Sequence, residues 1–290
     1  MLIVQYQAHL LIKRIIESTK PMEMPDTTIT RQSIQALILD MDGVLWRGSE
    51  PIGDLRSIFD KISQLGWKVI FATNNATRTI QQYVDVLASF GIQAQPWQII
   101  NSAIAVTHYL CQQHPHGGPV YIVGEQGVIE ACDQAGFYQS ENSVIAVIAG
   151  MDRQVTYEKL KIATILIRSG VPFIGTNPDV TFPTPYGLVP GAGSILAAIT
   201  AATGVDPIIA GKPEPTMYQI AVNRLKITPE SALVVGDRPE TDIAGAQQIG
   251  CHTALVLSGV TDAKQAASWQ PAPDIIEADL ASVIDHFISD

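Results

Sequence analysis

The fold is decided by one stretch, Ala36-Leu37-Ile38-Leu39-Asp40-Met41-Asp42-Gly43-Val44-Leu45. Its first half is a short apolar run, the pattern of a strand buried on both faces of a parallel sheet. The run ends in Asp40 and Asp42, and residues two apart in an extended chain point to the same side. The two carboxylates therefore project together from the carboxyl end of the strand, where open α/β sheets place their ligands.

The acidic pair has two interpretations. Two carboxylates so close repel each other, which raises the pKa of one of them unless a cation lies between. This favours one ionised nucleophile or metal ligand beside one protonated acid. The alternative is a pair that caps a helix or closes a turn, and for Asp-x-Asp alone this is the more common case. The rest of the chain decides between them.

Composition limits the class of protein. The chain has 290 residues, enough for one large domain or two ordinary ones, and 47% of them are hydrophobic. The net charge is 18 − 28 = −10, without a basic stripe, which excludes nucleic acid as a partner. No segment has membrane-spanning length, and three widely spaced cysteines indicate a reducing compartment. We therefore expect a cytoplasmic protein without a membrane partner.

The apolar pattern predicts two α/β units and an extension. Residues 34–102 alternate strand, helix, strand and helix, the rhythm of a doubly wound parallel sheet, and residues 201–290 resume it. Residues 103–200 form a second α/β unit inserted into the first. Its last part, residues 176–185, is rich in proline, which should prevent regular structure there. Residues 1–33 lie outside both units as an N-terminal extension.

Polar residues follow the other predicted strands. Thr73-Asn74-Asn75 follows an apolar strand and precedes a helix, an arrangement that binds anions or merely caps the helix through Asn75 or Thr77. Lys212 follows residues 208–210, and Asp237 and Asp242 follow residues 232–236. The carboxyl ends of parallel strands converge in one crevice. Three acids there cannot all be ionised without a metal, and oxygen ligands with phosphate chemistry indicate Mg²⁺.

The ordered set Asp-Met-Asp-Gly, Thr-Asn-Asn, Gly-Lys-Pro and Gly-Asp-(x)4-Asp resembles the haloacid dehalogenase (HAD) superfamily of phosphatases. Within it the chain is most similar to the NagD-like branch, which includes 4-nitrophenylphosphatases and pyridoxal-phosphate phosphatases. The similarity runs from about residue 36 to about residue 262 and includes the inserted unit, where that branch carries an α/β cap. The resemblance implies a Rossmann-like HAD core, residues 34–102 and 201–290, with a cap at residues 103–200.

The resemblance also implies a role for each motif. Asp40 attacks phosphorus and forms an aspartyl-phosphate. Asp42 protonates the leaving oxygen and then deprotonates the hydrolytic water. Thr73 holds the phosphoryl oxygens, and Lys212 offsets the charge on Asp40 and the phosphate.

The metal and substrate contacts follow from the same resemblance. Asp40, the backbone carbonyl of Asp42 and Asp237 would ligate Mg²⁺, with Asp242 behind them. The expected substrate contacts are Gly43, Thr73, Asn74, Asn75, Phe182 and Lys212.

The expected substrate is a small phosphorylated metabolite, selected by the cap. Phe182 stands where animal pyridoxal-phosphate phosphatases present a histidine, which argues against pyridoxal phosphate. Sugar phosphates, phosphoglycolate and aryl phosphates stay open. Two other functions stay open as well: a phosphotransferase with the same intermediate, and a receiver-like module that accepts phosphate on Asp40 without turnover. The second has no need of Asp42 or of so large a cap.

The extension gives a first prediction. A chain that begins at Met24 should keep full turnover and the same mass in solution, because no motif lies before Gln32. The competing hypothesis is an amphipathic helix through Leu10 and Ile15 that covers the interface of a homodimer. Activity assays and light scattering on the shortened chain decide between them, since aggregation or a changed oligomeric state would favour the helix.

Overall fold

The computed structural model describes residues 29–184 and 186–288. The helix considered through Leu10 and Ile15, and nearly all of the predicted extension, lie outside these residues. No helix within them is long and apolar enough to cross a membrane.

The acidic pair follows the central strand of a parallel sheet. In the described residues six strands form this sheet, in the order β15-β14-β13-β1-β4-β5, and every neighbouring pair is parallel. The strand that ends at the acidic pair, β1, is completely buried because it has a neighbour on each side and helices on both faces. The strands are β1 (Ala36–Leu39), β4 (Lys68–Thr73), β5 (Ile99–Asn101), β13 (Ala232–Gly236), β14 (His252–Val256) and β15 (Ile275–Glu277).

The side chains of β1 alternate between two apolar clusters, as expected for a doubly wound sheet. Ala36 and Ile38 pack into the cluster that contains α4 and α8. Leu37 and Leu39 pack into the cluster that contains α2, α3 and α11. The helices are α2 (Leu55–Leu65), α3 (Ile80–Ser89), α4 (Ser102–Gln113), α8 (Thr216–Leu225), α9 (Ala244–Gln247), α10 (Ala263–Ser268) and α11 (Leu280–Ile288). Short elements are β2 (Trp46–Arg47), β3 (Glu50–Pro51), η1 (Pro96–Gln98), η2 (Pro229–Ser231) and η3 (Pro239–Ile243).

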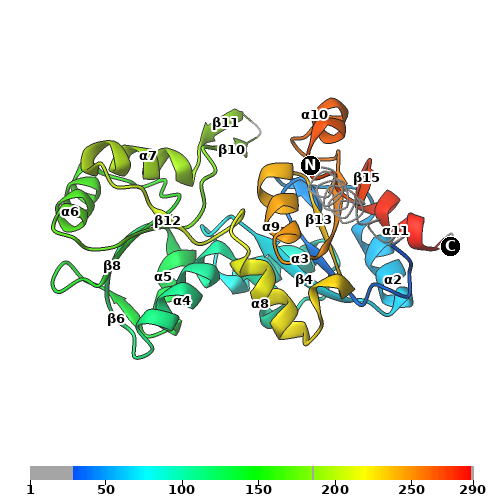
Figure 1. The fold of residues 1–290 in the computed structure, drawn as a ribbon, viewed down its shortest axis with the longest axis horizontal. Helices are drawn as coiled ribbons and strands as arrows, with labels where there is room; N and C mark the ends of the chain where they lie inside the picture. Colours follow the sequence, from blue (N-terminus) through cyan, green and yellow to red (C-terminus); the bar gives the residue numbers. More distant parts are fainter. Residues whose placement is uncertain (1–28, 185, 289–290) are drawn as a thin grey trace, which may run out of the picture.

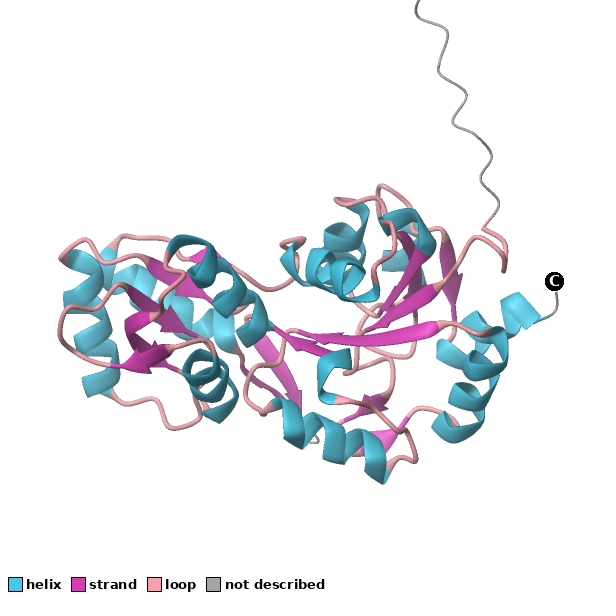
Figure 2. Cartoon of the chain, turned by 90° about the horizontal axis from the view of Figure 1, so that it is seen from below, coloured by secondary structure: helices cyan, strands magenta, loops and turns pink. Residues whose placement is uncertain are grey.

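A second parallel sheet forms the inserted unit, which lies beside the first in Figures 1 and 2. Its order among the described strands is β12-β9-β8-β6-β7. We expected the chain to return to the core at residue 201, but β12 pairs with β9, so the second sheet includes chain as far as Ile209. The elements are β6 (Gly118–Val123), α5 (Gln126–Gln134), β7 (Phe137–Gln139), β8 (Ala146–Ala149), α6 (Tyr157–Arg168), β9 (Phe173–Gly175), α7 (Ala192–Thr203) and β12 (Ile208–Ile209).

The proline-rich segment is more regular than its sequence predicts. Residues 176–185 were expected to lack regular structure, but β10 (Thr181–Thr184) pairs with β11 (Gly187–Pro190) in an antiparallel hairpin. In a two-stranded ribbon half of the backbone N–H groups point away from the partner strand, so proline is tolerated at those positions. The expectation was wrong because it ignored this edge position, and the hairpin places Phe182 at the site described below.

The two units are joined by apolar packing as well as by the chain. One apolar cluster runs from Ala36 in β1 through Val106 in α4 to Ile122 in β6. The start of α5 also lies directly against the core, because a Cβ on Gly127 would come within 2.2 Å of the Arg78 carbonyl oxygen. The inserted unit is therefore held against the core sheet at the end where the acidic pair lies.

Candidate active site

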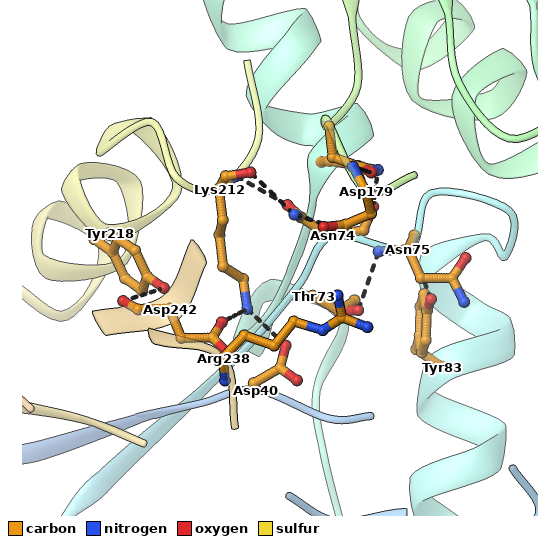
Figure 3. A network of polar contacts seen from close by, with 12 residues as sticks. Asp40, Thr73, Asn74, Asn75, Tyr83, Asp179, Lys212, Tyr218, Arg238 and Asp242 are labelled. Atoms are coloured by element: carbon orange, nitrogen blue, oxygen red, sulfur yellow. Dashed lines mark hydrogen bonds and ion pairs between the residues drawn. The ribbon is translucent and has the colours of Figure 1, made fainter. Parts of the chain in front are cut away.

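The predicted strand-end residues line one cavity of about 580 Å³. It lies between the carboxyl edge of the core sheet and the inserted unit, and Phe182 lines it from the β10–β11 hairpin. Figure 3 shows the polar residues at its base, which come from separate strands. The predicted residues that line it are Asp40, Asp42, Gly43, Thr73, Asn74, Asn75, Phe182, Lys212, Asp237 and Asp242.

The ammonium group of Lys212 lies between two carboxylates. Its Nζ is 2.6 Å from Asp40 Oδ1 and 2.6 Å from Asp242 Oδ1, and its side chain is only 2% exposed. Burial alone would lower the pKa of Lys212, but Asp242 and Asp40 raise it well above its ordinary value. Lys212 therefore stays charged and cannot act as a base.

Three carboxylates share this region with one lysine. Oxygen atoms of Asp40, Asp237 and Asp242 lie within 4.8 Å of one another. Burial raises the pKa of Asp40 despite Lys212, and burial together with Asp242 raises the pKa of Asp237 to about 7. Negative charge thus exceeds positive charge in a dry site, and a set of carboxylate oxygens suits a hard divalent cation. The residues present fit such an ion.

The carboxyl group of Asp42 lies outside this cluster. Its Oδ1 accepts a hydrogen bond from the indole Nε1 of Trp46 at 3.0 Å, and burial raises its pKa against that bond. Among the described residues its Oδ2 has no hydrogen-bond partner, and Asp42 lines the cavity. The carboxyl group of Asp42 is therefore separate from the acidic cluster, and the metal contact through its backbone carbonyl stays a prediction.

Two glycines make room for Asp237. A Cβ on Gly43 would lie 2.4 Å from Asp237 Oδ2, and one on Gly259 only 1.8 Å from it. Gly43 also has a φ of 88°, which a side chain would strain. The same oxygen accepts a hydrogen bond from the Val260 N–H at 2.8 Å. Gly43 was expected as a substrate contact. The structure shows that a side chain at this position would clash with Asp237 and strain the backbone.

The Thr73-Asn74-Asn75 turn is not the cap of α3, and its role in anion binding stays a prediction. The Thr73 hydroxyl accepts a hydrogen bond from the Asn75 N–H at 3.1 Å, and Asn75 Oδ1 accepts one from the Thr77 N–H at 3.0 Å. The cap of α3 is Thr79, in a capping box with Gln82. The capping alternative therefore named the wrong residues.

Asn74 uses its side chain to hold the lysine loop. Its Oδ1 accepts from the Lys212 N–H at 2.9 Å, and its Nδ2 donates to the Lys212 carbonyl at 3.0 Å. The same Nδ2 lies 3.1 Å from Asp179 Oδ2 in the inserted unit. Both side-chain polar atoms are thus engaged with protein, so Asn74, expected to bind substrate, is placed to position Lys212.

Sequence reasoning missed four residues around the site. Arg238 lines the cavity, and its position directly after Asp237 was a visible signal. Tyr218 donates a hydrogen bond to the Asp242 carbonyl at 3.0 Å. The contacts of Trp46 and Asp179 join residues that no spacing rule connects, so the sequence held no signal for them.

Comparisons with known proteins identify the family of this chain. Residues 37–138 match the haloacid dehalogenase-like hydrolase family, and residues 209–283 match a HAD-hydrolase-like family. A curated acid sugar phosphatase from Staphylococcus aureus is 35% identical over 251 residues, which cover 86% of this chain and 96% of that protein. The chain therefore belongs to the haloacid dehalogenase-like hydrolases.

Solved structures narrow the assignment within the family. NagD from E. coli superposes with a TM-score of 0.79 at 30% identity, covering 86% of this chain and 97% of that one. A 4-nitrophenylphosphatase from Thermotoga maritima superposes with a TM-score of 0.84 at 28% identity, covering 89% of this chain and 98% of that one. A glycerol phosphate phosphatase from Mycobacterium tuberculosis, in complex with magnesium, superposes with a TM-score of 0.81 at 35% identity. The match covers 87% of this chain and 77% of that one. The chain is a NagD-like phosphatase, which rules out a receiver-like module without turnover.

The crowding at Asp237 gives a second prediction. Gly259→Ala should weaken divalent-cation binding on the order of tenfold or more, because the added methyl group displaces a carboxylate of the acidic cluster. Titration calorimetry with Mg²⁺ measures this. Val260→Ala is the matched control, since it keeps the backbone N–H that holds Asp237 and should bind the ion as the unaltered chain does. Equal affinity in both variants would contradict the prediction.

Proposed function

We propose that this phosphatase hydrolyses small phosphomonoesters with Mg²⁺, through an aspartyl-phosphate on Asp40. The observation that carries the proposal is the paired environment of the two acids at one cavity. Asp40 Oδ1 is bound by Lys212, and among the described residues its Oδ2 has no hydrogen-bond partner. Asp42 keeps its own free oxygen on the same cavity. This arrangement supports Asp40 as the nucleophile and Asp42 as the proton donor.

In the first step an oxygen of Asp40 bonds to phosphorus and the bond to the leaving oxygen breaks. The proton of Asp42 goes to that oxygen, so the alcohol leaves neutral. In the second step Asp42, now a base, takes a proton from water as the water oxygen attacks phosphorus. The bond from phosphorus to Asp40 then breaks, which releases inorganic phosphate and regenerates both acids.

The surrounding residues stabilise this charge movement. Lys212 stays protonated beside Asp40 and offsets the charge of the phosphoryl group. The Thr73 hydroxyl and the backbone after it provide donors for phosphoryl oxygens. Mg²⁺, held by Asp40, the Asp42 carbonyl and Asp237 with Asp242 behind them, would neutralise phosphoryl charge when bound.

The substrate class follows from the cavity and the relatives. The relatives are an acid sugar phosphatase, a glycerol phosphate phosphatase and 4-nitrophenylphosphatases. The cavity offers Phe182 as an apolar surface and Asp179 and Thr181 as polar groups for a leaving group. We infer a sugar, polyol or other small phosphorylated metabolite, with aryl phosphates as surrogate substrates.

Removing the nucleophile gives the most general test. Asp40→Asn should abolish turnover on a panel of phosphorylated metabolites while circular dichroism stays unchanged, because the amide is a poor nucleophile of the same shape. EDTA should likewise abolish the activity of the unaltered chain. Asp133→Asn, an exposed site on α5 outside the cavity, is the matched control and should stay fully active. Full turnover of Asp40→Asn or in EDTA would refute the proposal, and alcohol acceptors in the assay would reveal phosphotransfer.

The proton donor gives a separate prediction. Asp42→Asn should lower kcat for alkyl phosphates roughly 10²- to 10⁴-fold, the usual contribution of general acid–base catalysis. The loss should be smaller for 4-nitrophenyl phosphate, whose leaving group needs little protonation. Steady-state kinetics on matched aryl and alkyl substrates measure the ratio. An equal loss on both would show that Asp42 serves the metal or the fold instead.

A further inference from the structure

Positive charge is scarce where the phosphoryl group must lie. The single positive charge of Lys212 is already shared between the carboxylates of Asp40 and Asp242. A phosphomonoester adds up to two further negative charges, and two non-bridging oxygens must be matched by donors as the phosphoryl group transfers. A second cationic side chain is therefore needed beside these phosphoryl oxygens.

Arg238 lies at the end of β13, directly after Asp237. Its backbone N–H donates to Asp242 Oδ2 at 3.0 Å, which fixes where its side chain begins. Figure 3 shows the side chain extending from there toward Thr73, and Arg238 lines the same cavity as Asp40 and Thr73. The guanidinium is part-buried, and it has no hydrogen-bond or ion-pair partner in the described part of the chain.

The charge of Arg238 acts on carboxylates on both sides of the cavity. Burial raises the pKa of Asp42, in the core, and Arg238 lowers it, though less than Trp46, Arg78 and Lys212 do. Arg238 acts in the same direction on the pKa of Asp237, and on that of Asp179 in the inserted unit. The guanidinium is thus close to several carboxylates, but it forms no ion pair with any of them in the described part of the chain. Its N–H donors are therefore available to an anion in the cavity.

The other two arginines near the site are engaged elsewhere. Arg47 lines the cavity, but it is exposed and its Nε donates to the Ser258 carbonyl at 2.5 Å. The Arg78 guanidinium lowers the pKa of Asp42 more than Arg238 does, but it lies 5.9 Å from the centre of the Tyr83 ring and is not among the cavity-lining residues. Arg238 is therefore the best-placed free donor.

We propose that the guanidinium of Arg238 binds the phosphoryl group directly, with its planar pair of N–H donors on two non-bridging oxygens. A guanidinium fork matches this oxygen geometry better than an ammonium does. Arg238 then adds a second positive charge to that of Lys212, and its guanidinium stays bound to the phosphoryl group in the substrate, in the aspartyl-phosphate and in inorganic phosphate. The assignment rests on the proposed function for its role in turnover, but the phosphate contact is testable without turnover.

The test measures the affinity of the Mg²⁺-loaded protein for inorganic phosphate by titration calorimetry. Arg238→Gln should weaken phosphate binding roughly 10- to 100-fold, the change expected when charge-assisted hydrogen bonds to one group are lost. Arg47→Gln removes the same charge from the same cavity and should change the affinity less than threefold. A loss in Arg238→Gln of under threefold, or an equal loss in Arg47→Gln, would overturn the proposal.

Two further measurements keep the result unambiguous. Circular dichroism checks that each variant is folded. If Arg238→Gln is not, Arg238→Lys takes its place: it keeps the charge but not the fork, so it should bind phosphate several-fold more weakly, and unchanged affinity would overturn the proposal. Phosphate binding that depends on Arg238 in a chain that hydrolyses no phosphomonoester would refute the proposed function and leave this contact standing.

Discussion

The site depends on the ion pairs of Lys212 with Asp40 and Asp242. Both N–O distances are 2.6 Å, and the lysine is almost fully buried. The two carboxylates stabilise the buried ammonium group, and the ammonium group stabilises each carboxylate. Losing one partner of such a buried pair typically costs about 3–5 kcal/mol. Asp40, Lys212 and Asp242 therefore form one unit. Lys212 is 172 residues from Asp40 and 30 residues from Asp242 along the chain, so the unit exists only when the core sheet is complete.

The scaffold around the lysine explains how so charged a unit stays ordered. Asn74 binds both backbone polar groups of Lys212, and Tyr218 binds the backbone of Asp242. Asn74 also reaches Asp179 in the inserted unit. One amide side chain thus joins the Thr73-Asn74-Asn75 turn, the lysine loop and the inserted unit. A shift of the inserted unit that moves Asp179 would therefore also move Asn74 and the backbone of Lys212.

The sequence predicted the central part of this arrangement. An apolar run that ends in acids must be a buried strand, and parallel strands must end together, so β1, β4 and β13 with Asp40, Thr73 and Asp237 follow from local pattern alone. The β10–β11 hairpin did not follow, because proline content does not reveal an edge position. The sequence also did not predict the pairing of β12 with the second sheet, because a strand of two residues is too short to show a hydrophobic periodicity. The Trp46 bond to Asp42 and the Asn74 bond to Asp179 depend on three-dimensional packing, which a strand pattern does not contain.

The central claim is that Asp40 carries the phosphoryl group during turnover, and chemical trapping tests it most directly. The protein is mixed with 4-nitrophenyl phosphate and Mg²⁺, quenched in acid within one turnover, and reduced with borohydride, which converts an acyl phosphate to the alcohol. The account predicts homoserine at position 40 by peptide mass spectrometry, and none when substrate is omitted. Rapid release of nitrophenol with position 40 unmodified, or with the modification at another residue, would contradict it.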